Sequence, residues 1–119
     1  RAGTALDVPG PDVSDGKRLQ RWTCTGSSAQ RWTFEADGTV RAGGKCMDVA
    51  WAATADGTAL QLANCSGNAA QKFVLSGAGD LVSVLANKCV DVPSSNSADG
   101  TKLQIWTCNG TAAQKWRRA

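Results

Sequence analysis

The sequence contains no histidine and no tyrosine, and no apolar run approaches the ~18 residues that a helix needs to cross a bilayer. Histidine is the side chain that most often serves as a general base or a metal ligand, so its absence disfavours most enzyme mechanisms. We therefore expect no metal, no cofactor and no catalytic residues. The absence of a long apolar run excludes a membrane-spanning helix, and we expect no membrane partner.

The 119 residues allow one compact domain, and an apolar fraction of 42% is too high for a disordered segment. The net charge is +3, with 13 basic and 10 acidic residues interleaved along the chain. Because no basic stripe forms, nucleic acid is not an expected partner. We also expect the protein to be a monomer. The chain starts at Arg1 without an initiator methionine or a signal segment, and we interpret it as a module of a longer precursor.

One unit is repeated three times along the chain. Residues 4–32, 45–73 and 88–116 align without a gap, and ten positions are identical in all three copies. Each copy carries an aspartate between apolar residues, then an Asp-Gly pair, Leu-Gln, a cysteine and Gln-x-aromatic. In the first copy these are Asp7, Asp15-Gly16, Leu19-Gln20, Cys24 and Gln30-Arg31-Trp32. Such a repeat predicts units that share one core.

The repeats predict an all-β domain with threefold pseudo-symmetry. Asp-Gly turn signals separate short apolar runs within each copy, and segments 33–40 and 74–82 between copies read as strand, turn and strand. No window has a sustained helical period. A closed ring of three units leaves no open sheet edge. We expect a single domain over 1–119, with repeats of approximately 1–40, 41–84 and 85–119, in which the first strand, at Arg1-Ala2-Gly3, completes the last unit.

The repeated motifs resemble a known family. Cys-x-Asp-Val, Asp-Gly-x-x-Leu-Gln, Cys-x-Gly and Gln-x-Trp, recurring at about 40 residues, resemble the ricin B-type β-trefoil lectins. The closest likeness is to the family 13 carbohydrate-binding modules attached to secreted bacterial glycoside hydrolases. The resemblance implies a β-trefoil of twelve strands with up to three sugar sites.

The resemblance also implies one disulfide in each of the last two repeats, Cys46–Cys65 and Cys89–Cys108. In the first repeat Ala5 stands where the family has cysteine, which leaves Cys24 without a local partner. We expect Cys24 to be a buried free thiol; an intermolecular bridge and a different pairing scheme are the alternatives. Disulfides in so small a domain are typical of an oxidising compartment, which predicts a secreted, extracellular protein.

Each repeat is expected to hold one sugar site. Binding a sugar in water requires a carboxylate that accepts hydrogen bonds, an amide and an aromatic face. The repeated aspartate supplies the carboxylate. In the family, the stacking ring stands fifteen residues later, at Trp22, Ala63 and Trp106 here, and the residue after the second cysteine is a further contact. The glutamine of Gln-x-aromatic is expected to orient the aspartate. The candidate residues are Asp91, Trp106, Asn109 and Gln114; Asp7, Trp22, Thr25 and Gln30; and Asp48, Ser66 and Gln71.

We expect the third repeat to bind best, the first next, and the second weakly, because Ala63 has no ring. Trp51, three residues after Asp48, could take the place of that ring. As alternatives, the aspartates could merely cap turns, and Trp22 and Trp106 could pack within hairpins. Gln-x-aromatic ends in Trp32, Phe73 and Trp116, which we expect in the core.

These expectations predict a non-catalytic module that binds polysaccharide of the xylan, β-glucan, arabinan or galactoside class. Two or three weak sites would act together, and a fused glycoside hydrolase would be brought to its substrate. A close carboxylate pair of the glycosidase type is not expected, because the aspartates lie in separate repeats. The alternative function is a protein-binding β-trefoil such as a protease inhibitor.

Overall fold

The computed structural model describes residues 4–9, 15–96 and 98–116. These residues form eleven strands: β1 (Thr4–Asp7), β2 (Lys17–Arg18), β3 (Gln20–Thr23), β4 (Thr33–Phe34), β5 (Val40–Ala42), β6 (Lys45–Val49), β7 (Leu60–Ala63), β8 (Phe73–Leu75), β9 (Leu81–Ser83), β10 (Lys88–Asp91) and β11 (Gln104–Trp106). The helices among them are single 3-10 turns: η1 (Ser28–Gln30), η2 (Ala50–Ala52), η3 (Ala69–Gln71), η4 (Pro93–Ser95) and η5 (Ala112–Gln114). Nothing in this part of the chain is long and apolar enough to cross a membrane as a helix.

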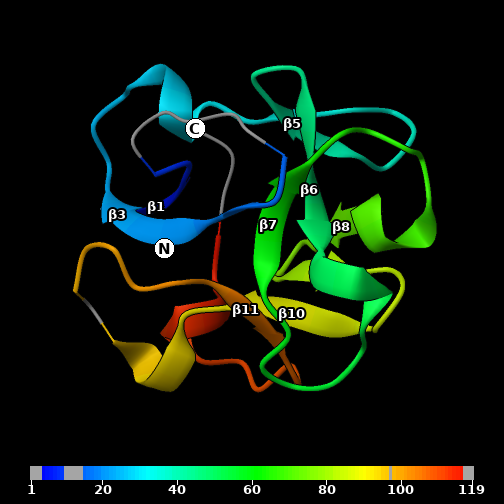
Figure 1. Cartoon of the computed structure of the whole chain (residues 1–119). Coiled ribbons are helices and arrows are strands. Elements are labelled where there is room, and N and C mark those ends of the chain that lie inside the picture. Colours follow the sequence, from blue (N-terminus) through cyan, green and yellow to red (C-terminus); the bar gives the residue numbers. More distant parts are fainter. Residues whose placement is uncertain (1–3, 10–14, 97, 117–119) are drawn as a thin grey trace.

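The strands form three equivalent units. Each repeat contains one long antiparallel pair, namely β1 with β3, β6 with β7, and β10 with β11. The hairpins β4–β5 and β8–β9 connect successive repeats, as the segments 33–40 and 74–82 predict. In Figure 1 the three long pairs surround a common centre. The threefold, all-β architecture predicted from the repeats is therefore confirmed. The predicted role of Arg1-Ala2-Gly3 lies outside the described residues.

A closed cycle of backbone hydrogen bonds joins the repeats at their centre. The amide of Leu19 donates to the carbonyl of Leu60 at 3.0 Å, Leu60 to Leu103 at 3.3 Å, and Leu103 back to Leu19 at 3.0 Å. All three leucine side chains are fully buried. Because buried backbone groups must be paired, this cycle holds all three repeats in one register.

The Asp-Gly turns link neighbouring repeats around the same centre. Each turn glycine donates its amide hydrogen to a carbonyl of the next repeat: Gly16 to Leu62 at 2.7 Å, Gly57 to Ile105 at 2.9 Å, and Gly100 to Arg21 at 2.8 Å. These glycines have φ between 83° and 91°, a region that side chains rarely adopt.

The aspartates of these turns also accept hydrogen bonds from the next repeat. The donor is the backbone amide directly before the second-half cysteine: Asn64 to Asp15 at 2.7 Å, Thr107 to Asp56 at 2.7 Å, and Thr23 to Asp99 at 2.8 Å. A motif that reads in the sequence as a local turn thus also joins neighbouring repeats.

The core contains the side chains that the repeats predict. Phe73 and Trp116 are buried, and Trp32 is half-buried against the same apolar cluster. The indole Nε1 of Trp32 donates to the carbonyl of Leu6, and that of Trp116 to the carbonyl of Val90, both at 3.0 Å. The predicted core role of these three residues is confirmed. Two of them also tie the last turn of a repeat to its first strand.

One core position is polar in the first repeat only. Arg21 is buried where the other repeats have Leu62 and Ile105. Its Nη1 contacts Asp99 of the third repeat at 2.7 Å, but its buried Nε has no hydrogen-bond partner among the residues that the structure describes. Removing a guanidinium nitrogen from water without a partner costs free energy. The Arg21–Asp99 pair therefore joins the first and third repeats, but the unpaired nitrogen reduces its net contribution to the free energy of folding.

The cysteines pair as the resemblance implies, with one exception in burial. Disulfides join Cys46 to Cys65 and Cys89 to Cys108. Cys24 is a free thiol, but it is exposed, so the expectation of a buried thiol is wrong. The position lies beyond an exposed strand end, where the equivalent Cys108 is exposed as well although it is disulfide-bonded.

Asp56→Asn is expected to weaken the acid sensitivity of folding. Desolvation raises the pKa of Asp56, but hydrogen bonds from the amide and hydroxyl of Thr107, with the Lys88 ammonium, lower this pKa below its ordinary value overall. A lowered pKa stabilises the folded state above the unfolded-state value of about 3.9, and this stabilisation is lost as pH falls through the folded-state value. The free energy of unfolding in urea should fall less between about pH 5 and 3 in the variant than in the wild type. Glu35→Gln controls for net charge, and identical pH slopes for Asp56→Asn and the wild type would contradict the expectation.

Arg21→Leu is expected to raise the free energy of unfolding by about 1 kcal/mol, because it removes a buried nitrogen that has no partner. Asp99 keeps its bonds to the amide and hydroxyl of Thr23. Urea denaturation measures the change. The reverse substitution Leu62→Arg is the matched control and should be strongly destabilising; a marked loss of stability in Arg21→Leu would show that the ion pair is favourable.

Cys24 should be the reactive thiol of the native protein. Treatment of the folded, unreduced protein with an aromatic disulfide reagent should release one thiolate equivalent per chain, because Cys24 is exposed and the other four cysteines are paired. Cys24→Ser should release none. A thiol that reacts only after denaturation would show that Cys24 is buried.

Candidate functional site

The repeated aspartates are held by glutamines on the neighbouring strand. Asp7 lies opposite Gln20, Asp48 opposite Gln61 and Asp91 opposite Gln104 in the antiparallel pairs. In each pair the glutamine Nε2 donates to the aspartate Oδ2, at 2.7, 2.8 and 2.8 Å. The aspartates are 6% to 8% exposed. Among the described residues only glutamine side chains, and no backbone amides, donate to these carboxylates, which disagrees with the alternative that the aspartates merely cap turns.

The glutamines of Gln-x-aromatic have a different role from the one expected. Gln30 Nε2 does contact Asp7 Oδ1, at 3.2 Å. In the other repeats Gln71 donates to the carbonyl of Asn64 and Gln114 to that of Thr107. The expectation that this glutamine orients the aspartate is therefore wrong for Gln71 and Gln114, whose Nε2 atoms donate to backbone carbonyls.

Instead, the Gln-x-aromatic glutamines shape the loop that follows the second-half cysteine. Their Oε1 atoms accept the backbone amides of Thr25, Ser66 and Asn109 at 2.8, 2.8 and 2.9 Å. These are the residues predicted as further sugar contacts. The sequence did not lead us to expect a site role for Gln20, Gln61 and Gln104. Their Leu-Gln motif is nevertheless identical in all three repeats, and this identity could have indicated such a role.

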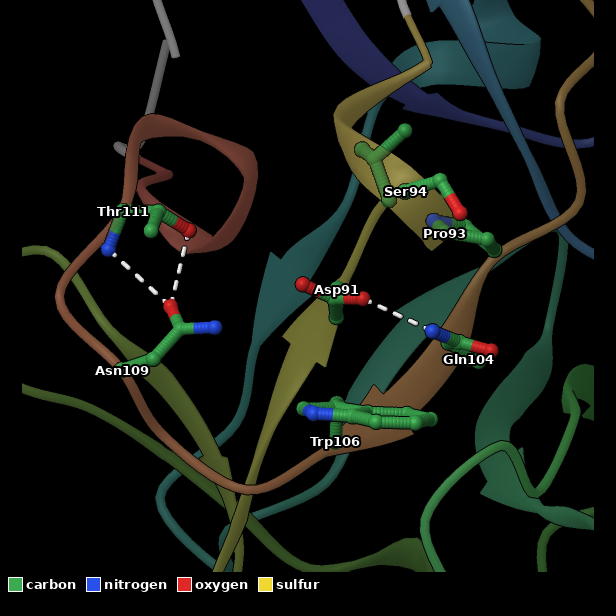
Figure 2. A pocket seen from close by; sticks show the side chains of 8 residues that line it. Asp91, Pro93, Ser94, Gln104, Trp106, Asn109 and Thr111 are labelled. Carbon is green, nitrogen blue, oxygen red and sulfur yellow. Dashed lines mark hydrogen bonds between the residues drawn. The ribbon is translucent and has the colours of Figure 1, made fainter.

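The third repeat forms a hollow of about 370 Å³ beside its aspartate (Figure 2). Three predicted site residues, Asp91, Trp106 and Asn109, line it together. Gln114 is buried behind Asn109. The remaining lining residues, which the sequence did not single out as contacts, are Val92, Pro93, Ser94, Gln104 and Thr111.

A donor and an acceptor face each other in this hollow. Asn109 Oδ1 accepts from the amide and hydroxyl of Thr111 at 3.1 and 2.8 Å, which turns its Nδ2 into the hollow (Figure 2). Gln104 occupies Asp91 Oδ2, so Oδ1 is left toward Asn109. Neighbouring hydroxyls of a sugar can donate to one group and accept from the other. With one carboxylate in the lining, the arrangement suits binding and lacks the acid–base pair of a glycosidase.

Trp106 forms one wall of the hollow. Its side chain is 40% exposed, and that of Trp22 in the first repeat is 38% exposed. Both rings leave a face in solvent and are not packed as hairpin core. Trp22 is supported by the Asp99-Gly100 turn of the third repeat. A Cβ added at Gly100 would lie 3.8 Å from the Cζ3 atom of Trp22, which is an ordinary van der Waals distance. The ring of the first repeat therefore lies against the third repeat, whereas all residues that line the hollow of the third repeat belong to that repeat.

The first repeat has the same parts with weaker polar groups. Asp7 accepts from both Gln20 and Gln30, so both of its oxygens are engaged. Thr25 stands at the position of Asn109, and its hydroxyl accepts from the amide of Ser27 at 3.3 Å. A hydroxyl offers one donor where an amide offers two. Asp7, Trp22 and Thr25 thus come from equivalent positions but lack the directed amide.

The second repeat has no ring at the usual wall. Ala63 on β7 lies opposite Cys46 on β6. The Ser66 hydroxyl accepts a hydrogen bond from the amide of Asn68 at 3.4 Å. Asp48 and its glutamine are arranged as in the third repeat. Trp51 does not fold over this aspartate: its side chain is 95% exposed.

The comparisons with known proteins agree with this geometry. Residues 1–116 match the ricin-type beta-trefoil lectin domain. The chain belongs to this family. Ricin-type domains are carbohydrate-binding and non-catalytic. The designed threefold-symmetric protein ThreeFoil has a TM-score of 0.89 and 31% sequence identity, with 98% of this chain and 90% of that chain covered. The β-trefoil fold is thereby confirmed.

Two curated relatives are bacterial enzymes much longer than this ricin-type domain. "Serine protease 1" of Rarobacter faecitabidus is 61% identical over 82 residues, which is 69% of this chain and 16% of the protease. A glucan endo-1,3-beta-glucosidase of Cellulosimicrobium cellulans is 55% identical over 40 residues, or 34% of this chain and 7% of the enzyme. This chain therefore spans less than a fifth of the length of either relative.

Proposed function

We propose that this ricin-type domain binds polysaccharide through two or three weak sites and thereby targets an attached hydrolase to its substrate. The observation that carries the proposal is the hollow of the third repeat. There Asp91 Oδ1 and Asn109 Nδ2 have no hydrogen-bond partner among the described residues and could bond a pair of sugar hydroxyls, and Trp106 offers its ring to the C–H face of the same sugar. These are the groups that fix the orientation of a polar ligand with an apolar face.

A single site of this kind should be weak. The hollow of about 370 Å³ is at the small end of ligand sites and has room for little more than one sugar unit. We expect a Kd of about 1 mM for one site, because so small a contact leaves little surplus after the cost of association.

Several such sites on one body would bind a polymer more tightly by raising the effective concentration. The whole molecule measures 31 × 29 × 23 Å, so the sites of different repeats lie within reach of one polysaccharide chain. Xylan, β-glucan, arabinan and galactan are the candidate classes, because all carry neighbouring hydroxyls that fit a carboxylate and an amide.

The attached enzyme and the location follow from the same proposal. The glucanase relative supports a glycoside hydrolase as the fused partner, and the protease relative broadens this class to hydrolases. The two disulfides support an oxidising, extracellular environment. We propose that the domain itself acts as a monomer, since its sites are each built within one chain.

Trp106→Ala should weaken polysaccharide binding more than Trp22→Ala does. We expect a loss of about five- to tenfold for Trp106→Ala and about twofold for Trp22→Ala, because only the third repeat has a directed amide beside its ring. The measurement is retardation in native gels cast with xylan, laminarin, arabinan or galactan. Asp91→Ala should reduce retardation in the gel in which Trp106→Ala does.

The matched control is Val84→Ala, which removes an exposed apolar side chain from the β9–β10 turn. Equal losses for Trp106→Ala and Trp22→Ala would refute the order of the sites. Unchanged mobility of the wild type in all four gels would refute the polysaccharide function. Inhibition of a serine protease by the wild type, in the absence of retardation, would instead support a protein-binding trefoil.

A further inference from the structure

We propose that Trp51 gives the second repeat a sugar-stacking surface on the opposite side of its aspartate from Trp22 and Trp106. This inference rests on the proposed function and adds a third site of different geometry. Trp51 is 95% exposed, whereas Val74, the next most exposed large apolar residue in the described part of the chain, is 57% exposed. Nearly the whole apolar surface of Trp51 is in water, so a ligand that covered its ring would gain free energy by burying that surface.

The backbone fixes Trp51 in this outward position. Trp51 and Ala52 have φ of 59° and 52°, in the left-handed region that residues other than glycine seldom occupy. The turn is anchored at both ends, because the amide of Ala50 donates to the carbonyl of Ala59 at 3.0 Å and that of Ala53 to Ala50 at 3.2 Å. The ring is therefore presented by a defined turn, η2.

The third repeat shows where this turn lies relative to a site. Trp51 aligns with Ser94, which has a φ of 53° in the equivalent turn η4. Ser94 lines the third hollow on the side of Asp91 away from Trp106 (Figure 2). By the same geometry Trp51 stands beside Asp48, on the side away from Ala63.

Large and small residues are exchanged between these two walls. The third repeat has Trp106 on one wall and Ser94 on the other, and the second has Ala63 and Trp51. In the sequence of the first repeat the corresponding residues are Trp22 and Gly10. Each repeat therefore carries one tryptophan at one of two positions that flank its aspartate.

The polar groups needed beside such a ring are present. Asp48 Oδ2 is held by Gln61 Nε2 at 2.8 Å, as in the third repeat, and no described residue donates to its Oδ1. A sugar unit could therefore stack on Trp51 and donate a hydroxyl hydrogen to Asp48 Oδ1. Because Ala63 leaves the usual wall open, the polysaccharide chain can continue past it. The ligand we assign is an interior unit of a polysaccharide chain.

The test uses the full chain with both other rings removed. In a Trp22→Ala/Trp106→Ala background, retardation by the polysaccharide that most retards the wild type should remain measurable. Adding Trp51→Ala should reduce it by roughly three- to tenfold, the range expected for loss of one aromatic contact. Adding Trp51→Phe should preserve most of it, and adding Val84→Ala should leave it unchanged.

A second measurement is independent of the stability of the multiple variants. In wild-type protein labelled with 5-fluorotryptophan, the ¹⁹F resonance assigned to Trp51 through Trp51→Phe should shift on titration with laminarin, xylan, arabinan or galactan oligosaccharides. The resonance of the buried Trp116 provides the internal control.

The outcomes separate the two proposals. If no polysaccharide retards the wild type, the proposed function fails and this inference fails with it. If the wild type is retarded but Trp51→Ala has no effect in the double variant, or the double variant has no retardation left and the Trp51 resonance does not shift, only the Trp51 site is refuted. Self-association that Trp51→Ala abolishes, measured by sedimentation, would assign the ring to a second copy of the chain and overturn the proposal.

Discussion

The cycle of amide-to-carbonyl bonds among Leu19, Leu60 and Leu103 is the constraint on which the rest of the structure depends. Each leucine both donates and accepts, so no repeat can shift along its strands without breaking two of the three bonds. The cycle is buried, where an unpaired amide or carbonyl is costly. It therefore gives the three repeats equivalent positions around the centre of the molecule, whatever side chains they carry at the surface.

The repeated sites follow from that register. A glutamine one residue after each central leucine lies opposite the aspartate and holds its Oδ2 atom. The Asp-Gly turn four residues before the leucine reaches the next repeat and secures the strand end that bears the ring position. Since no repeat can supply both parts alone, binding residues and folding contacts share the same boundaries. Substitutions at Asp56 or Asp99 should consequently affect a neighbouring site as well as stability.

The sequence predicts the inner part of the molecule well and the outer part less well, for a physical reason. Ten identical positions in three copies require three similar environments, so the threefold fold could be predicted. The exposed rings at Trp22 and Trp106 were expected from the family resemblance. The two disulfides rested on resemblance. Which of two glutamines meets the aspartate depends on cross-strand register, which spacing along one strand does not reveal. The exposure of Cys24 likewise depends on a strand end in three dimensions.

The first repeat illustrates how departures from symmetry are accommodated. It lacks the disulfide that closes β6–β7 and β10–β11 at their outer ends, because Ala5 replaces a cysteine. It also carries Arg21 at a core position and pairs it with Asp99 of the third repeat. A disulfide chiefly restricts the unfolded chain, whereas a buried ion pair must first overcome desolvation. The first repeat thus lacks a covalent link between its own strands, and the Arg21–Asp99 pair adds little to the bonds that the amides of Gly100 and Thr23 already make across the boundary with the third repeat.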